Sequence, residues 1–456
     1  MPALKTARKP VWPPHPPANE SEDAARVRLE EEAEAKRVSE SIDRALLAER
    51  ELVKKQSSGP KLLLLGQAES GKSTILKNFQ LHLSPKAFDA EAIVWSPVIQ
   101  LNLVRSVNFI LNLLNDNCKH RRESATATQS RQRDGPRRHL IRLAPLRHVE
   151  DSLTKKISGS PRNSRAQEKT IHYHPSKASE IELRSGSGWK GLFKLKRQTD
   201  IADADDGSNR RILAACADDI FRMWADPAVR QCLATNDIVL EDQPGFFLED
   251  VKRITEENYI PTPADILRAR VATIGPEEHH IHVEGGLTER AHHWTIYDVG
   301  GYRSQRAAWA QFFDDVNVII FLAPMSAFNQ TLAEDDGMNR LVDSMRLWEQ
   351  ISANKILASV ELILFLNKLD ILDVKLRSGI QIAQFITSYG DRPNDTKHVA
   401  KYLRDVFVAL HQQYSPKKRK MYPHLTCAID THATSSVINQ VQDLVLVKLL
   451  AQSNIL

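Results

Sequence analysis

Short apolar segments recur along the chain, separated by longer stretches in which the apolar residues have helical spacing. Several of the short segments are apolar at consecutive positions, so both faces of each would be buried, as in a parallel sheet covered by helices. The pattern predicts an α/β domain with a mostly parallel sheet and helices on both faces. The predicted strands are residues 61–66, 293–299, 316–323, 360–367 and 424–428.

A block with mainly helical spacing, about residues 89–258, separates the first predicted strand from the others. We therefore expect an all-α helical domain inserted into the α/β domain. Before the first strand, residues 9–17 are Pro-rich and predict an extended tail, and residues 21–55 predict a highly charged helix. The expected divisions are residues 1–57 for the tail and charged helix, 58–88 and 264–456 for the α/β domain, and 89–263 for the helical domain.

Positive charge is concentrated in one stretch of the helical block. Residues 119–197 contain 20 Lys and Arg against 7 Asp and Glu, in a chain whose net charge is only +5. The stretch is rich in Ser and poor in periodic apolar residues, so residues 119–209 are expected to form a disordered, basic insertion. A patch for anionic lipid or nucleic acid is the alternative. Because the whole chain is less basic than a dedicated nucleic-acid binder, we expect no nucleic-acid partner.

Cysteine usage and hydropathy favour a soluble intracellular protein. The four cysteines, at positions 118, 216, 232 and 427, are widely scattered, which argues against a zinc cage and a disulfide framework. No apolar run approaches the roughly 18 residues that span a bilayer. The N-terminus lacks the apolar segment of a secretory signal peptide.

A phosphate-binding motif follows the first predicted strand. The sequence GQAESGKS at residues 66–73 matches G-x-x-x-x-G-K-[ST] and precedes a helical pattern, as this motif requires. Its glycines let backbone N–H groups turn toward phosphate oxygens at a helix N-terminus. Lys72 should reach the β and γ phosphates, and Ser73 should bind Mg²⁺. A Gly-rich turn with an exposed lysine is the structural alternative.

The choice of base is predicted by Asn367-Lys368-Leu369-Asp370, directly after the strand ELILFL. A carboxylate at Asp370 can accept two hydrogen bonds, from N1–H and the exocyclic amine of guanine, whereas adenine has no such pair of donors. Guanine is therefore favoured. For Asp370 alone, the alternative role is a helix N-cap.

Two further segments carry groups suited to a triphosphate and its metal ion. Asp298-Val299-Gly300-Gly301 ends another apolar strand, where the Asp can bind Mg²⁺ through water and a Gly N–H can contact a γ-phosphate. Upstream, the sequence DILRARVAT supplies Arg270 and, three residues later, the hydroxyl of Thr273.

With these motifs, the chain resembles a heterotrimeric G-protein α subunit. The resemblance rests on several motifs in order along the chain: IDR, GQAESGKS, NYIPTPADILRARV, DVGG with a following Arg, LAEDDGMNRLVDSM, FLNKLD and TCAIDT. It implies a Ras-like P-loop GTPase domain with a helical domain that closes over the nucleotide.

The resemblance also implies roles for individual residues. Arg270 corresponds to the family's cis-acting arginine, Thr273 to its Mg²⁺ ligand, and Glu69 to the acid that pairs with that arginine in the absence of a γ-phosphate. Gly301 corresponds to the glycine that senses the γ-phosphate, followed by the arginines at 303 and 306. Asp226, in MWADPAV, corresponds to a helical-domain residue that leans over the nucleotide. The implied metal ligands are Ser73, Thr273 and, through water, Asp298. The implied nucleotide-binding residues are Gly66, Glu69, Ser70, Gly71, Lys72, Ser73, Thr74, Asp226, Leu267, Arg268, Arg270, Thr273, Asp298, Gly301, Asn367, Lys368, Asp370, Cys427 and Ala428.

The chain departs from the family pattern at several positions. Tyr302 stands where the family has a Gln that orients the attacking water, so we expect slow hydrolysis. Pro2 replaces the glycine of a myristoylation signal, and the first cysteine is Cys118, so no N-terminal acylation is expected. Ser453 stands where some family members have a cysteine.

The resemblance implies a guanine-nucleotide-dependent signalling switch that binds GTP and GDP with Mg²⁺, couples receptors to effectors and slowly hydrolyses GTP. The expected partners are a G-protein βγ dimer, a G-protein-coupled receptor, an effector that the sequence does not identify, and an anionic membrane surface contacted through the basic insertion. The expected location is the cytoplasm or the cytoplasmic face of the plasma membrane. The alternative, favoured by Tyr302, is a degenerate scaffold that binds GTP or GDP without useful hydrolysis; an ATPase or kinase is disfavoured by NKLD.

Overall fold

The computed structural model describes residues 21–56, 59–123, 134–158, 174–181, 203–273, 275–284, 293–416 and 419–452. The chain divides into two compact units, Met1–Gly59 and Pro60–Leu456. In the first unit, α1 (Glu22–Gln56) confirms the predicted charged helix. The Pro-rich tail lies outside the described residues.

The second unit contains a six-stranded sheet with the strand order β2-β3-β1-β4-β7-β8. All neighbouring strands are parallel except β2 and β3, which are antiparallel. Four of the predicted strands are present within two residues of their expected bounds, and the fifth, predicted at residues 424–428, lies three residues earlier as β8. The edge strand β2 was not predicted because its sequence, EEHHIH, is mostly polar. The strands are β1 (Lys61–Gly66), β2 (Glu277–His282), β3 (His293–Asp298), β4 (Val318–Pro324), β7 (Glu361–Asn367) and β8 (Met421–Leu425).

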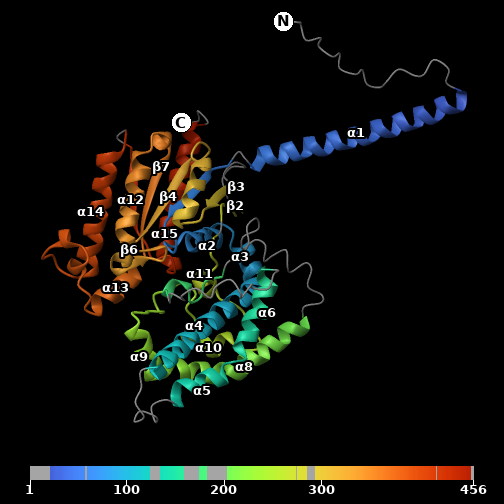
Figure 1. Cartoon of the computed structure of the whole chain (residues 1–456). Helices are drawn as coiled ribbons and strands as arrows, with labels where there is room; N and C mark the ends of the chain where they lie inside the picture. The colour runs from blue at the N-terminus through green and yellow to red at the C-terminus, as the bar shows by residue number, and fades with distance from the viewer. Residues whose placement is uncertain are drawn as a thin grey trace, which may run out of the picture. The chain divides into compact units, whose positions relative to one another are not determined.

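Helices cover both faces of this sheet, as predicted (Figure 1). Leu62 and Leu64 of β1 pack in the same core as residues of α2 (Lys72–Leu83) and α15 (Thr431–Gln452). Leu63 and Leu65, which point the other way, pack with α12 (Arg340–Ala353) and α14 (Thr396–Tyr414). Because β1, β3, β4, β7 and β8 are parallel, the loops that follow them meet at one edge of the sheet.

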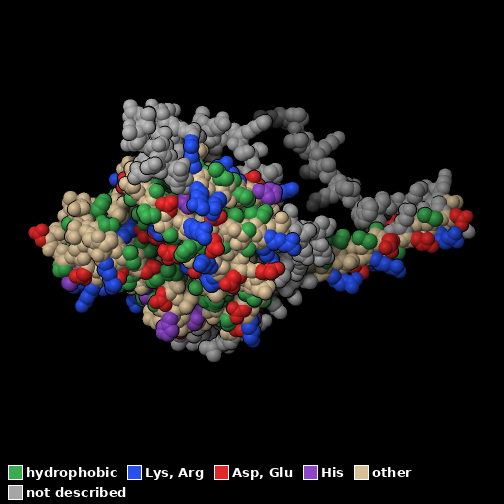
Figure 2. All heavy atoms as spheres, turned by 90° about the horizontal axis from the view of Figure 1, so that it is seen from below, with side chains coloured by type: hydrophobic (Ala, Val, Ile, Leu, Met, Phe, Trp, Pro, Cys, Tyr) green, Lys and Arg blue, Asp and Glu red, His purple; other side chains and the backbone are tan. Residues whose placement is uncertain are grey.

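The helical part lies between β1 and β2 in the chain and forms a separate layer beside the sheet (Figure 1). Seen from below, its surface shows a row of Lys and Arg side chains bordered by acidic and apolar ones (Figure 2).

Among the described residues, one helical stretch, Pro85–Asn117, is long and apolar enough to cross a membrane. However, 78% of its most apolar 18-residue segment is buried, as in a core helix. The helices are α3 (Pro85–Glu91), α4 (Ser96–Glu123), α5 (Asp134–Arg142), α6 (Leu146–Ser158), α8 (Asp203–Ala225), α9 (Pro227–Thr235), α10 (Val251–Ile254) and α11 (Pro263–Arg268).

The structure corrects the expectation that residues 119–209 lack structure. Helices α5, α6 and the start of α8 lie in this range, and Leu146, Val149 and Leu153 of α6 are buried in the core of the helical part. Their spacing of three and four residues is helical, but the high charge around them hid it. Residues 174–181 are also described, whereas residues 124–133, 159–173 and 182–202 lie outside the described part of the chain.

The remaining elements connect the strands and helices above, and each has at most ten residues. They are α13 (Leu369–Arg377), β5 (Thr331–Leu332), β6 (Asp335–Asn339), and the 3₁₀ helices η1 (Ala92–Trp95), η4 (Pro175–Lys177), η5 (Leu248–Asp250), η7 (Arg303–Phe312), η8 (Met325–Asn329), η9 (Ile356–Ser359), η10 (Ile382–Gln384) and η11 (Thr387–Tyr389).

Candidate functional site

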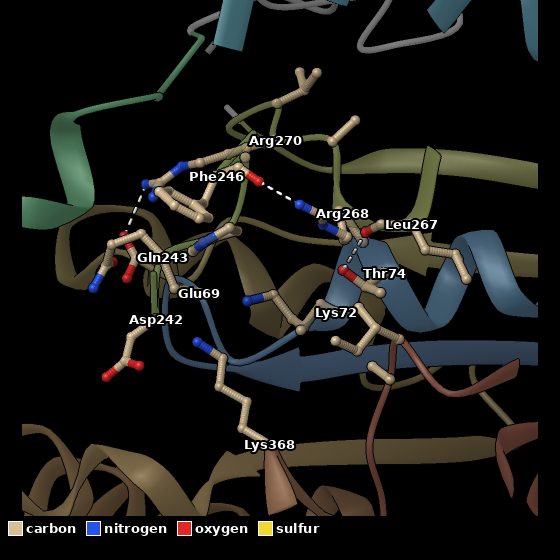
Figure 3. A pocket seen from close by; sticks show the side chains of 18 of the residues that line it. Glu69, Lys72, Thr74, Asp242, Gln243, Phe246, Leu267, Arg268, Arg270 and Lys368 are labelled. Carbon is tan, nitrogen blue, oxygen red and sulfur yellow. Dashed lines mark hydrogen bonds and ion pairs between the residues drawn. The ribbon is translucent and has the colours of Figure 1, made fainter. Parts of the chain in front are cut away.

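A cavity of about 620 Å³ lies between the carboxyl edge of the sheet and the helical part (Figure 3). Its volume is in the range of small-molecule and cofactor sites. The sheet part contributes residues of the loop after β1, of the segment after β3 and of the loop after β7, and the helical part contributes residues 241–246 and Glu180. Thr74, Leu267 and Arg268 also line it, and Thr74 Oγ1 donates to the Leu267 carbonyl at 3.4 Å.

The loop between β1 and α2 needs glycine at two positions. Gly66 and Gly71 have φ angles of 144° and 104°, a region that favours glycine. A Cβ at Gly66 would also meet the carbonyl oxygen of Leu322, and one at Gly71 would meet the side-chain amide of Asn367. The loop therefore packs directly against its neighbours and delivers the N-terminus of α2 to the cavity, where backbone N–H groups favour an anion.

Lys72 and Lys368 bring positive charge to the cavity. Lys72 Nζ donates to the carbonyls of Gly66 at 2.9 Å and Gln67 at 2.7 Å. Burial lowers the pKa of Lys72 to about 8 and also lowers the pKa of Lys368 to about 8. Both side chains point into the cavity (Figure 3). A bound anion would stabilise their charged forms, so the cavity suits phosphate groups.

Three oxygen-bearing side chains meet at the start of α2. Ser73 Oγ donates to Asp298 Oδ2 at 2.7 Å, Thr273 Oγ1 donates to the same oxygen at 3.1 Å, and the two hydroxyls are 3.0 Å apart. Asp298 is fully buried, and burial raises the pKa of its carboxyl. Its Oδ1 has no hydrogen-bond partner among the described residues. A hard cation such as Mg²⁺ prefers oxygen ligands of this kind, so these residues fit the predicted metal site.

Arg270 is bound by carboxylates from both parts of the unit. Its Nη2 lies 2.8 Å from Glu69 Oε1 and 3.3 Å from Glu180 Oε1. Figure 3 draws the pair with Glu69 as a dashed line. Burial raises the pKa of Glu69, but Arg270 and Arg340 outweigh it and lower that pKa to about 2. The Nη1 atom of Arg270 is buried with no hydrogen-bond partner among the described residues. Arg270 is therefore a fixed cation with one donor nitrogen left for a ligand.

At the other end of the cavity, Asn367 at the end of β7 hydrogen-bonds to the loop after β1 and to the segment after β8. Its Nδ2 donates to the Ser70 carbonyl at 2.8 Å, and its Oδ1 accepts from Thr426 Oγ1 at 3.2 Å and from Ala428 N at 3.1 Å. Asp370 and Ala428 line the cavity, whereas Cys427 does not. The N-cap of α13 is Lys368, with a φ angle of 63°, so Asp370 is in the first turn and is not the cap. Its carboxylate lies beside the Cys427 thiol and also faces the cavity, where a ligand can reach it.

The segment after β3 packs against the loop after β1. A Cβ at Gly301 would meet the backbone of Gln67 and Ala68. Arg306 Nε donates to the Gly301 carbonyl at 3.2 Å, and Arg303 pairs with Asp335 at 2.7 Å. Tyr302 lines the cavity beside Gly301, and its hydroxyl donates to Glu180 at 2.6 Å.

Asp226 is a helix cap and is not among the residues that line the cavity. Asp226 caps α9, where it accepts a hydrogen bond from Ala228 N, and it lies 2.8 Å from His139, so it does not line the cavity. The acidic residues that the helical part brings to the cavity include Glu180 and Asp242, which the sequence analysis missed. Asp242 precedes a turn at Gly245, whose φ angle is 80°, and this Gln-Pro-Gly turn is the one sequence signal that could have indicated it.

Comparisons with known proteins agree with this geometry. The sequence pattern of the G-protein alpha subunit family matches residues 36–445. The chain is 30% identical to the guanine nucleotide-binding protein alpha-4 subunit of Mycosarcoma maydis over 546 aligned positions, which cover 94% of this chain and 92% of that protein. It is also 30% identical to the guanine nucleotide-binding protein alpha-2 subunit of Neurospora crassa over 425 aligned positions, covering 93% and 97% of the two chains. Since both the family pattern and these relatives span most of its length, the chain belongs to the family of G-protein alpha subunits.

Proposed function

We propose that the cavity binds GTP and GDP with Mg²⁺ and that the protein is a signalling switch that hydrolyses GTP. The observation that carries this proposal is the meeting, in one cavity, of Lys72, Arg270, Asp370 and the hydroxyls of Ser73 and Thr273, which both bond to the buried Asp298 behind them. Each of these groups matches a different part of a guanine nucleotide and its metal ion.

The proposed binding mode follows from where these groups lie. Lys72 and the backbone N–H groups at the start of α2 bind the phosphates, and Asp370 accepts hydrogen bonds from guanine. Ser73, Thr273 and, through water, Asp298 would hold Mg²⁺, which would neutralise part of the phosphate charge when it is bound. Arg270 leaves Glu69 and donates to the phosphoryl oxygens on which negative charge grows during transfer.

The proposed switch depends on the γ-phosphate. Thr273 and Gly301 lie on separate segments that each reach the cavity, and a γ-phosphate with its metal ion binds both. After hydrolysis these contacts are lost, so both segments are released and the surface that they form changes.

The experiment that tests the proposed function is titration of the purified chain with GTP and ATP in the presence of Mg²⁺, followed by phosphate release from bound GTP. We expect much tighter binding of GTP, because adenine does not offer Asp370 two donors. Tighter binding of ATP would overturn the proposal. Binding of GTP without any hydrolysis would favour the alternative of a nucleotide-dependent scaffold.

We propose that hydrolysis is slow because Tyr302 does not orient the attacking water. Its hydroxyl is bonded to Glu180 and sits at the end of a rigid ring, whereas a Gln amide offers a donor and an acceptor on a flexible stem. Arg270 stabilises the transition state separately and does not replace this function.

Replacing Tyr302 with Gln should raise the rate of single-turnover GTP hydrolysis by about tenfold or more, because an amide that orients water is restored. The rate is measured as phosphate release from preloaded GTP, so nucleotide exchange does not enter. Tyr302→Phe, which has neither donor nor acceptor, should not reproduce the increase. A Gln variant no faster than wild type would show that another residue positions the water.

Alpha subunits of this family act with βγ dimers and receptors, and we propose the same partners here, with an unidentified effector. Helix α1 is charged but exposes Val27, Val38 and Ile42, which share one face at helical spacing and suit a partner.

We also propose a location on the cytoplasmic face of the plasma membrane, with the basic residues 119–197 binding anionic lipid. Cosedimentation with anionic vesicles at low and high salt tests this, and binding that is absent at low salt would reject it.

A further inference from the structure

We propose that Glu180 is a positioning residue that binds Tyr302 and Arg270 together and thereby slows release of the nucleotide. This inference rests on the proposed function, in which the cavity between the two parts holds GDP or GTP. It gives a role to Glu180, which lies within the basic residues 119–197, and to Tyr302, which stands where the family has a glutamine.

Both contacts of Glu180 involve the same carboxylate oxygen. Tyr302 Oη donates to Glu180 Oε1 at 2.6 Å, and Arg270 Nη2 lies 3.3 Å from that oxygen. The Glu180 and Arg270 side chains are only 8% and 6% exposed. Burial raises the pKa of Tyr302, so its hydroxyl stays protonated and remains a donor. Hydrogen bonds to a charged group in such an environment are among the stronger ones in proteins.

The backbone around Glu180 is fixed on both sides. Asn102 Nδ2 donates to the Ser179 carbonyl at 2.8 Å, and Ser179 Oγ donates to the Pro244 carbonyl at 2.6 Å. Ala272 N donates to the Ile181 carbonyl at 2.8 Å. Ser179 and Ile181 are each only 2% exposed. The backbone at Glu180 is therefore held by hydrogen bonds on both sides, and it lies directly beside the segment that carries Arg270 and Thr273.

The bond between Glu180 and Tyr302 joins the two parts across the cavity. Tyr302 follows Gly301, which packs on the loop after β1, so it belongs to the sheet part. The cavity is lined by residues of both parts, so a movement of the helical part away from the sheet widens the way out for a nucleotide, and this movement must break the bond. Asp242 and Lys375, 3.2 Å apart, form a second and separate contact between the parts.

The test is a double-mutant cycle on nucleotide release. Tyr302→Phe, Glu180→Gln and the double variant are loaded with fluorescent GDP, and dissociation is followed in excess unlabelled GDP. Each single variant should release GDP about tenfold faster than wild type, because Tyr302→Phe removes the donor of this hydrogen bond and Glu180→Gln removes the charge that strengthens it. The double variant should be no more than about twofold faster than the faster single variant, because both substitutions act on the same bond.

Matched controls separate this effect from general loss of stability. Tyr402→Phe loses a hydroxyl bonded to Ser388, and Asp219→Asn loses a pairing with Arg142, and neither residue lines the cavity. Both should release GDP at the wild-type rate. The midpoint of thermal unfolding is measured for every variant, since a residue needed only for folding would lower the midpoint without coupling to its partner.

The outcomes are distinct. Release that is unchanged in either single variant, or rates that multiply in the double variant, would overturn the role of Glu180. If Glu180→Gln does not fold, Glu180→Asp, which keeps the charge on a shorter stem, replaces it in the cycle and must show the same coupling. If wild-type protein binds no fluorescent GDP, the proposed function itself fails, irrespective of Glu180.

Discussion

Replacing Arg270 with Lys should lower the rate of single-turnover GTP hydrolysis about a thousandfold, while GTP stays bound. This magnitude is the one known for arginine fingers, of which Gα proteins with an arginine in cis are an established example, and it does not come from the geometry here. The geometry supports the role: the guanidinium is buried, it lines the cavity, and its Nη1 has no partner among the described residues. A lysine keeps the charge but lacks the planar fork that can contact two phosphoryl oxygens.

The matched control for Arg270 is its neighbour Arg268, which also lines the cavity. Arg268 Nη2 donates to the Phe246 carbonyl at 2.6 Å and lies 2.9 Å from Asp250, so its guanidinium is already engaged (Figure 3). Arg268→Lys should therefore reduce hydrolysis far less than Arg270→Lys. Phosphate release from preloaded GTP and equilibrium GTP binding are measured for both variants. An Arg270→Lys rate within tenfold of wild type would contradict the assigned role.

The parts of the site that could be predicted from the sequence are those encoded by consecutive residues. Residues 66–73 combine their glycines, lysine and serine in one turn, and the local backbone is enough to place them at the start of α2. Asp370 follows a strand whose neighbours are parallel, so strand order brings it to the same edge as Lys72. The apolar strands themselves were found because both of their faces are buried.

The parts that could not be predicted depend on contacts between distant segments. Glu180 lies in a stretch whose composition indicates disorder, and its place is set by Asn102, Pro244 and Ala272, none of which is close in sequence. Asp226 directly precedes α9 and Asp242 lies in a turn after that helix, and only the structure shows that the first caps α9 while the second lines the cavity. The edge strand β2 was missed because it is buried on alternate residues, and its exposed positions are polar.

Replacing Asp370 with Asn should lower GTP affinity about a hundredfold and raise the affinity for xanthosine triphosphate relative to GTP. The carboxylate of Asp370 accepts from N1–H and the exocyclic amine of guanine, and an amide has only one acceptor oxygen. Loss of one of two charge-assisted hydrogen bonds, with a donor now facing a donor, has an effect of this order. Xanthine carries a 2-oxo group in place of the amine, so the new amide can donate to it. Affinities are measured by competition with a fluorescent guanine nucleotide.

Asp373 provides the matched control, because it lies on the same helix α13 but does not line the cavity. Its carboxylate accepts from Thr396 Oγ1 at 2.6 Å and pairs with Arg377 at 3.0 Å, so Asp373→Asn changes the same charge on the same element without touching the base. This variant should keep both the GTP affinity and the preference for guanine over xanthine. The swap of preference is the decisive result, since general damage to the cavity lowers the affinity for every nucleotide and cannot improve one relative to another. If Asp370→Asn bound GTP as wild type does, or weakened both nucleotides equally, Asp370 would not be the group that recognises guanine.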